Sequence, residues 1–141
     1  MFPKFVGVLL IAVTGSTARA NPPDADVIGT WEVAEFVYEG KALTPEQLAQ
    51  GRATITKERM TIRLPKVPDG TVDLTYSRVV GGIDLLAADD EPEFDPLPGV
   101  WELKDGLLRI AFSNHPQDGD RPKSARAGKG VTYFALRKVR Q

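Results

Sequence analysis

The chain has 141 residues, of which 42% are hydrophobic and 26% charged, a composition that predicts one globular domain and excludes a wholly disordered chain. Its formal net charge is −1, so bulk charge gives no attraction to nucleic acid or to anionic lipid. Because it has no cysteine, disulfides, thiolate catalysis and cysteine-ligated metals are excluded.

Residues 1–20 have the composition of a secretory signal peptide. Lys4 supplies a positive charge, an apolar run follows over 5–13, and residues 18–20 (Ala-Arg-Ala) match a small-residue cleavage site. The run is too short for the roughly twenty apolar residues that span a membrane. We therefore expect cleavage after Ala20 and an exported protein, periplasmic or secreted, without a stable membrane anchor. Removing the leader leaves 16 basic residues against 19 acidic ones.

The first strand is predicted over residues 27–38. Its large side chains change parity at residues 34–35. A β-bulge there would keep Trp31, Phe36 and Tyr38 on one face of the strand.

One short helix is predicted after the first strand. Thr44 is a suitable N-cap, Pro45 suits the first helical position, and Gln47 completes a capping box. Gly51 supplies a C-terminal stop. The spacing predicts a helix of about two turns.

The rest of the chain reads as short strands with apolar residues at alternate positions. They are predicted over 52–56, 60–64, 71–77, from Ile83 to about 87, and over 99–103, 107–112 and 130–138. Asp105-Gly106 predicts a tight hairpin turn. Turn signals recur about every ten residues, which is typical of a sandwich or barrel. We predict an all-β fold over 27–141, an eight-stranded antiparallel up-and-down barrel with one short helix, after an extended linker over 21–26.

Gly29-Thr30-Trp31 resembles the Gly-x-Trp signature of lipocalins. In that family the tryptophan closes one barrel end and a basic residue of the last strand packs over it, a role that Arg137 or Lys138 could take here. Further matching segments are Gly40-Lys41, residues 83–85, 99–103 and 107–110, Arg121-Pro122, and Leu136-Arg137. Over about residues 27–140 the chain resembles a family of exported lipocalin-like domains of unknown function, numerous in planctomycete bacteria. The resemblance implies a barrel with Gly29, Trp31 and Arg137 at its closed end, and it implies no reaction.

Two features with titratable side chains could form a metal site or a catalytic site, but the pattern around each favours a solvated loop. Residues 89–95 carry clustered carboxylates that could bind calcium, but they lack the spacing of a calcium loop and also suit a solvated loop. His115 is the only histidine, without a nucleophile motif or partner ligands around it. We predict no catalytic residue, no metal and no cofactor.

Basic residues gather in the last long loop: Arg121, Lys123, Arg126 and Lys129. They could steer an anion or contact the acidic loop across the barrel mouth, or they could only keep the loop soluble.

Aromatic residues at inward positions line either a packed core or an apolar cavity. Tyr38 and Tyr76 are the first candidates to face a ligand, because a buried phenol can give it one directed hydrogen bond. The candidate ligand-binding set is Tyr38, Tyr76, Phe36, Trp101, Phe112 and Arg121. Such a cavity is expected to open near residues 65–70 and 113–129.

These features predict a monomeric, non-catalytic exported binding module that holds a small apolar or amphipathic molecule in the barrel. Two alternatives stay open. The protein could be an interaction or inhibitor module with a packed barrel that acts through its loops, or an enzyme of unknown reaction. No nucleic-acid partner is expected.

Overall fold

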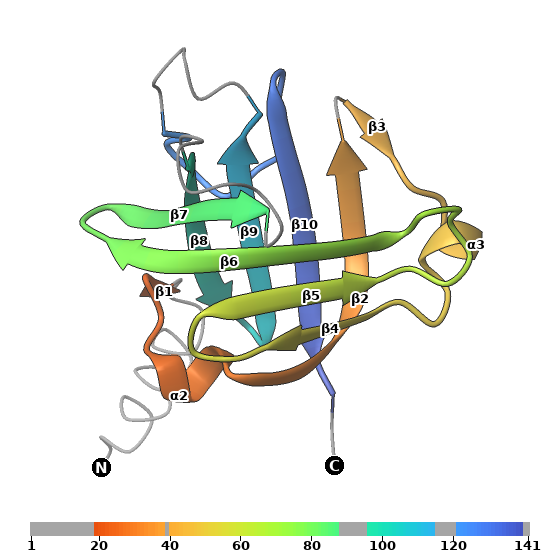
Figure 1. Cartoon of the computed structure of the whole chain (residues 1–141), viewed down its shortest axis with the longest axis horizontal. Helices are drawn as coiled ribbons and strands as arrows, with labels where there is room; N and C mark the ends of the chain where they lie inside the picture. Colours follow the sequence, from red (N-terminus) through yellow and green to blue (C-terminus); the bar gives the residue numbers. More distant parts are fainter. Residues whose placement is uncertain (1–18, 39, 88–95, 115–120, 140–141) are drawn as a thin grey trace, which may run out of the picture.

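The fold is described by a computed structural model, which covers residues 19–38, 40–87, 96–114 and 121–139. Eight antiparallel strands close into an up-and-down barrel, which confirms the predicted fold class (Figure 1). They are β2 (Gly29–Tyr38), β4 (Arg52–Ile55), β5 (Arg59–Arg63), β6 (Thr71–Val79), β7 (Gly82–Ala87), β8 (Leu97–Lys104), β9 (Leu107–Ser113) and β10 (Val131–Lys138). Each pairs with the next in this order, and β10 returns to pair with β2.

The β-bulge expected in the first strand is present. Along the β2–β10 ladder Ala135 pairs with Glu35, whereas the next residue, Leu136, pairs with Val33. Ala34 is therefore skipped, and the parity of β2 changes at this point. As a result both Trp31 and Phe36 belong to the interior cluster.

The short elements differ in part from expectation. α3 (Pro45–Leu48) has the predicted capping box, with Thr44 Oγ1 accepting from the Gln47 amide at 3.2 Å, but it makes one turn rather than two. The extended linker predicted over 21–26 is extended at Pro23 but not beyond it, because α2 (Asp24–Val27) begins at the next residue. Its prolines precede the helical turn and so break none of its hydrogen bonds.

Two further strands have only two residues each. β3 (Lys41–Ala42) pairs with β2, and β1 (Arg19–Ala20) pairs with β8. No helix within the described ranges is long and apolar enough to cross a membrane.

The end of the barrel where β2 begins, called the lower end here, is closed by Trp31. The indole is 1% exposed, and its Nε1 donates to the Val27 carbonyl of α2 at 2.9 Å. Lys138 Nζ lies 4.7 Å from the indole centroid and donates to the Ile28 carbonyl at 3.1 Å. A Cβ at Gly29 would lie 2.9 Å from Lys138 Nζ, so the glycine of Gly-x-Trp leaves room for this lysine.

The structure corrects the choice of Arg137 as the residue over Trp31. Phe134 and Leu136 point into the interior, so alternation turns Arg137 outward and brings Lys138 back to the inner side. Arg137 instead lines a cavity on the outer surface.

The interior contains one contiguous cluster of apolar side chains. Its largest fully buried members are Trp31, Trp101, Phe134, Ile55, Met60, Ile62, Ile83, Leu85, Leu108, Ile110, Leu136 and Val27. Burial of these side chains, each contributing on the order of 1.5–3 kcal/mol, holds together a domain that has no disulfide.

Candidate functional site

The residues predicted to bind a ligand lie in four different places. Tyr76 and Trp101 pack edge to face in the interior, with ring centroids 5.4 Å apart. The Tyr76 hydroxyl donates to the Thr56 carbonyl at 2.6 Å, so its directed hydrogen bond is made within the domain. Tyr38 is 58% exposed at the opposite, upper end of β2, and the expectation that it faces a cavity is wrong. The two tyrosines thus lie at opposite ends of the barrel and cannot share a small ligand.

Phe36 and Phe112 do converge, in the upper part of the interior. Phe134 stacks on Phe36 with centroids 5.7 Å apart and meets Phe112 edge to face at 6.5 Å. Phe36 is only half-buried. The opening expected near 65–70 and 113–129 includes residues 115–120, which lie outside the described ranges, so the predicted inner cavity stays a prediction.

Arg121 lies on the outer surface and binds the protein itself. Its Nη1 donates to the carbonyls of Ile83 on β7 and Gly99 on β8, at 2.7 and 2.9 Å. Its Nη2 contacts Asp84 Oδ1 at 2.9 Å. A Cβ on Gly82 would collide with the Gly99 carbonyl oxygen, so the two strands approach closely here. Arg121 therefore holds the last long loop against the β7–β8 seam, and these three contacts are all made within the domain, so its role as a ligand contact stays a prediction.

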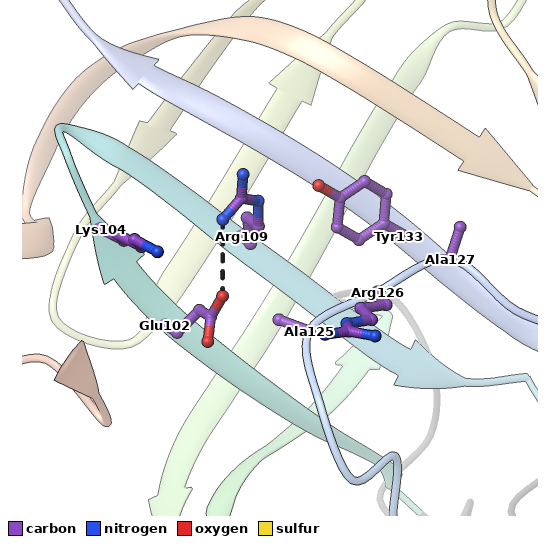
Figure 2. Close-up of a pocket in the computed structure, with 7 residues that line it drawn as sticks. All are labelled: Glu102, Lys104, Arg109, Ala125, Arg126, Ala127 and Tyr133. Carbon is purple, nitrogen blue, oxygen red and sulfur yellow. Dashed lines mark ion pairs between the residues drawn. The ribbon is translucent and has the colours of Figure 1, made fainter. Parts of the chain in front are cut away.

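Beside this fastening point lies a cavity of about 570 Å³, called the outer groove. It lies on the outside of β8, β9 and β10, with the loop residues Ala125 to Ala127 along one side (Figure 2). The residues that line it are Glu102, Lys104, Arg109, Ala125, Arg126, Ala127 and Tyr133. Ala125 is itself buried, which shows that the loop packs onto the barrel.

The outer groove carries three cations and one carboxylate. Arg109 Nη1 pairs with Glu102 Oε1 at 3.6 Å, and both side chains are about one-third exposed. Within the described part of the chain, no hydrogen bond or ion pair holds the side chain of Lys104 or of Arg126, although the Arg126 backbone amide donates to the Ser124 carbonyl. Burial raises the pKa of Tyr133, the charge of Glu35 raises it further, and a hydrogen bond with Arg109 opposes the rise. Its phenol is thus neutral at physiological pH.

Two further cavities are lined by described residues. One, of about 270 Å³, adjoins the outer groove and is lined by Lys104, Asp105, Leu107, Arg109 and Arg137. The other, of about 420 Å³, lies beside α2 and β6 and is lined by Asp24, Lys57, Glu58, Thr75, Tyr76, Ser77 and Arg78. Two carboxylates balance two cations in its lining. Arg78 already has partners within the domain, because it pairs with Asp24 at 2.8 Å and lies 4.8 Å from the Trp101 ring centroid.

The outer groove was missed by reasoning from the sequence, although a signal for it exists. Glu102, Lys104, Arg109 and Tyr133 all have the parity opposite to the core residues of their strands. Of the basic loop residues, Arg126 lines the groove, whereas Lys123 and Lys129 are exposed elsewhere. Residues 89–95 and His115 lie outside the described ranges. Among described residues no three His, Asp or Glu side chains gather as metal ligands would.

Comparison with known proteins gives no family. The chain matches no protein-family model, and it has no significant match among curated proteins or solved structures. The resemblance to lipocalin-like domains therefore stays a prediction, and the functional argument rests on the geometry alone.

Proposed function

We propose that this protein is a non-catalytic binding module that holds an anionic group of its ligand in the outer groove. The observation that carries the proposal is the excess of cations there, three against one carboxylate, in a protein whose net charge is −1. Lys104 and Arg126 support it most directly, because neither side chain has a partner within the described residues.

The chemistry of the lining favours binding over reaction. Arginine donates planar pairs of hydrogen bonds that suit carboxylate, sulfate and phosphate oxygens. The volume falls within the range of small-molecule sites, about 300–1,000 Å³, but the charged lining suits a hydrated anion better than an apolar ligand. None of the lining residues is a histidine, serine or threonine, and the neutral Tyr133 is a poor base.

Export, which the first twenty residues predict, would present the outer groove to ligands beyond the cytoplasm. This proposal keeps the binding-module class expected from the sequence and moves the binding site from the barrel interior to its outer face. It also agrees with the alternative of a packed barrel that acts through a loop.

Calorimetric titration with citrate at low salt tests the proposal. We expect weak saturable binding that Arg126→Gln reduces about threefold, since exposed ion pairs contribute about 0.2–1 kcal/mol. Lys129→Gln removes the same charge from the same loop outside the groove, and should leave the affinity unchanged. Equal losses in the two variants, or no saturable binding, would reject the outer groove as the site.

A second candidate is the apolar ligand expected from the sequence. The half-buried Phe36, stacked on Phe134, favours the upper interior for it. N-phenyl-1-naphthylamine, an uncharged fluorescent probe, would report on this site. Its fluorescence should rise on binding and fall again in Phe36→Ala, whereas citrate should not displace it.

A further inference from the structure

The outer groove and the smaller cavity adjoin each other, and together they are called the combined site. Lys104 and Arg109 line both cavities. Arg126 lines only the larger one, and Arg137 lines only the smaller one. The two cavities, of about 570 and 270 Å³, thus share two cations, and each has one further arginine of its own.

Strand register gives this combined site its direction. Ala111 lies opposite Tyr133 in an upper row, Arg109 lies opposite Glu102 in a middle row, and Leu107 lies between Lys104 and Arg137 in a lower row. Rows of outward side chains on a sheet are about 6.6–6.8 Å apart. Register therefore places Arg109 in the middle row and Lys104 and Arg137 in the lower row, one row spacing apart, while Arg126 lines the larger cavity from the loop.

Small or buried residues of β9 and β10 lie beside the cationic side chains. Ala111 and Ala135 point outward but are fully buried in one cluster with Tyr133, which is itself only 6% exposed, so they lie beneath the lining residues and do not line either cavity. The walls combine cations with hydrogen-bond acceptors, because Glu102 and Asp105 line the two cavities beside the basic residues.

We propose that the combined site binds an acidic oligosaccharide in extended form, with carboxylates of different sugar units on successive cationic rows. This inference rests on the proposed function and names its ligand class. Sugar carboxylates would pair with Arg126, Arg109 and the Lys104–Arg137 row. Sugar hydroxyls would donate to Glu102 and Asp105, which have oxygen acceptors to offer.

The same lining argues against other polyanions. A chain with phosphate at every unit and no hydroxyl donors between would be repelled by Glu102 and Asp105. Single-stranded nucleic acid is held by aromatic faces on which bases stack, and the Tyr133 ring is buried and offers no such face.

The test compares ligands that are built from the same sugar acid and differ only in the number of sugar units. Galacturonate, its dimer and its tetramer are titrated into the protein by calorimetry at low salt, with neutral maltotetraose and polyphosphate as comparison ligands. We expect the tetramer to bind about tenfold more tightly than the monomer, because a second contact on the same chain is intramolecular. Maltotetraose should not bind, and polyphosphate should bind more weakly than the tetramer.

Two variants separate this inference from the proposed function. Arg137→Gln should weaken tetramer binding about threefold and leave monomer binding unchanged, whereas Arg126→Gln should weaken both. Lys129→Gln is the matched control, and thermal unfolding checks that each variant is folded.

If the monomer binds but neither the length of the sugar chain nor Arg137→Gln changes the affinity, the site holds a single anion. In that case the inference fails while the proposed function stands. Tighter binding of polyphosphate or of maltotetraose would overturn the ligand class. Absence of all binding would overturn the proposed function too.

Discussion

The lower interior and the outer groove differ in whether their polar side chains have partners within the protein. Two donors of the lower interior are bonded to the backbone, whereas two cations of the outer groove have no bonded partner in the described part of the chain. In the interior, Trp31 Nε1 and the Tyr76 hydroxyl each donate to a backbone carbonyl of the same domain. On the outer face, within the described residues, the side chains of Lys104 and Arg126 border a cavity without a partner. Groups satisfied internally stabilise a fold, whereas charged groups left to solvent cost little and stay available to a ligand. The bonded donors of the lower interior therefore stabilise the fold, whereas the cations of the outer groove are available for binding.

The largest effect expected from this contrast is on the interior side. Trp31→Ala should lower the free energy of unfolding by about 3–5 kcal/mol, because it opens a cavity at the lower end and removes the partner of the Val27 carbonyl. Urea denaturation followed by circular dichroism measures the loss. Trp31→Phe should retain part of the stability, and a loss below about 1 kcal/mol in the alanine variant would contradict the assigned role.

Arg121 holds the loop that carries Arg126 against β7 and β8, so its replacement should affect both stability and binding. Arg121→Gln should cost about 1.5–3 kcal/mol, because charged hydrogen bonds to Ile83, Gly99 and Asp84 are lost. It should also weaken citrate binding, since the loop that carries Arg126 is released. Denaturation and calorimetry on one preparation test both effects, with Lys123→Gln as the control. A variant with full stability would show that the loop is held by other contacts.

A smaller effect is expected for the interior hydroxyl. Tyr76→Phe should lower the free energy of unfolding by about 0.5–1.5 kcal/mol, because the Thr56 carbonyl loses its donor while the ring keeps its packing against Trp101. Citrate affinity should not change. A change in affinity without a change in stability would place Tyr76 in the ligand site after all.

The smallest effect is confined to alkaline pH. Burial raises the pKa of both Tyr76 and Tyr133, with nearby carboxylates adding to the rise. A group whose folded pKa lies above its unfolded value of about 10 contributes stability that is fully present below that pH. This stability is lost as the pH rises through the folded pKa. Melting temperatures between pH 8 and 11.5 should therefore fall from about pH 10 upward, and less steeply when both tyrosines are replaced by phenylalanine. Equal slopes would contradict the assignment.

Local patterns predicted most of the fold. Alternation located all eight barrel strands, the capping box located α3, and the parity change located the bulge at Ala34. Lys138 could also have been preferred to Arg137 over Trp31, since Phe134 and Leu136 set the parity of β10. These features depend on neighbours in sequence, which is why a single chain reveals them.

The candidate site depended on register and on a loop, which the sequence does not specify. Outward parity marks Glu102, Arg109 and Tyr133 as surface residues, but only the ladders place them side by side. The position of Arg126 depends on three bonds that Arg121 makes to residues 22 to 38 positions away. Contacts between positions so far apart follow from the closed barrel, not from any local pattern.

Strand β1 contains the residue after which the sequence predicts cleavage. Ala20 pairs with Glu102 of β8, and the Asn21 amide donates to the Trp101 carbonyl at 3.4 Å, so the peptide bond predicted to be cut is tied into the sheet on both sides. A peptidase needs its substrate as a free, extended segment. Cleavage after Ala20, which the sequence predicts, would therefore have to come before β1 pairs with β8, and a precursor that folds first would protect this bond.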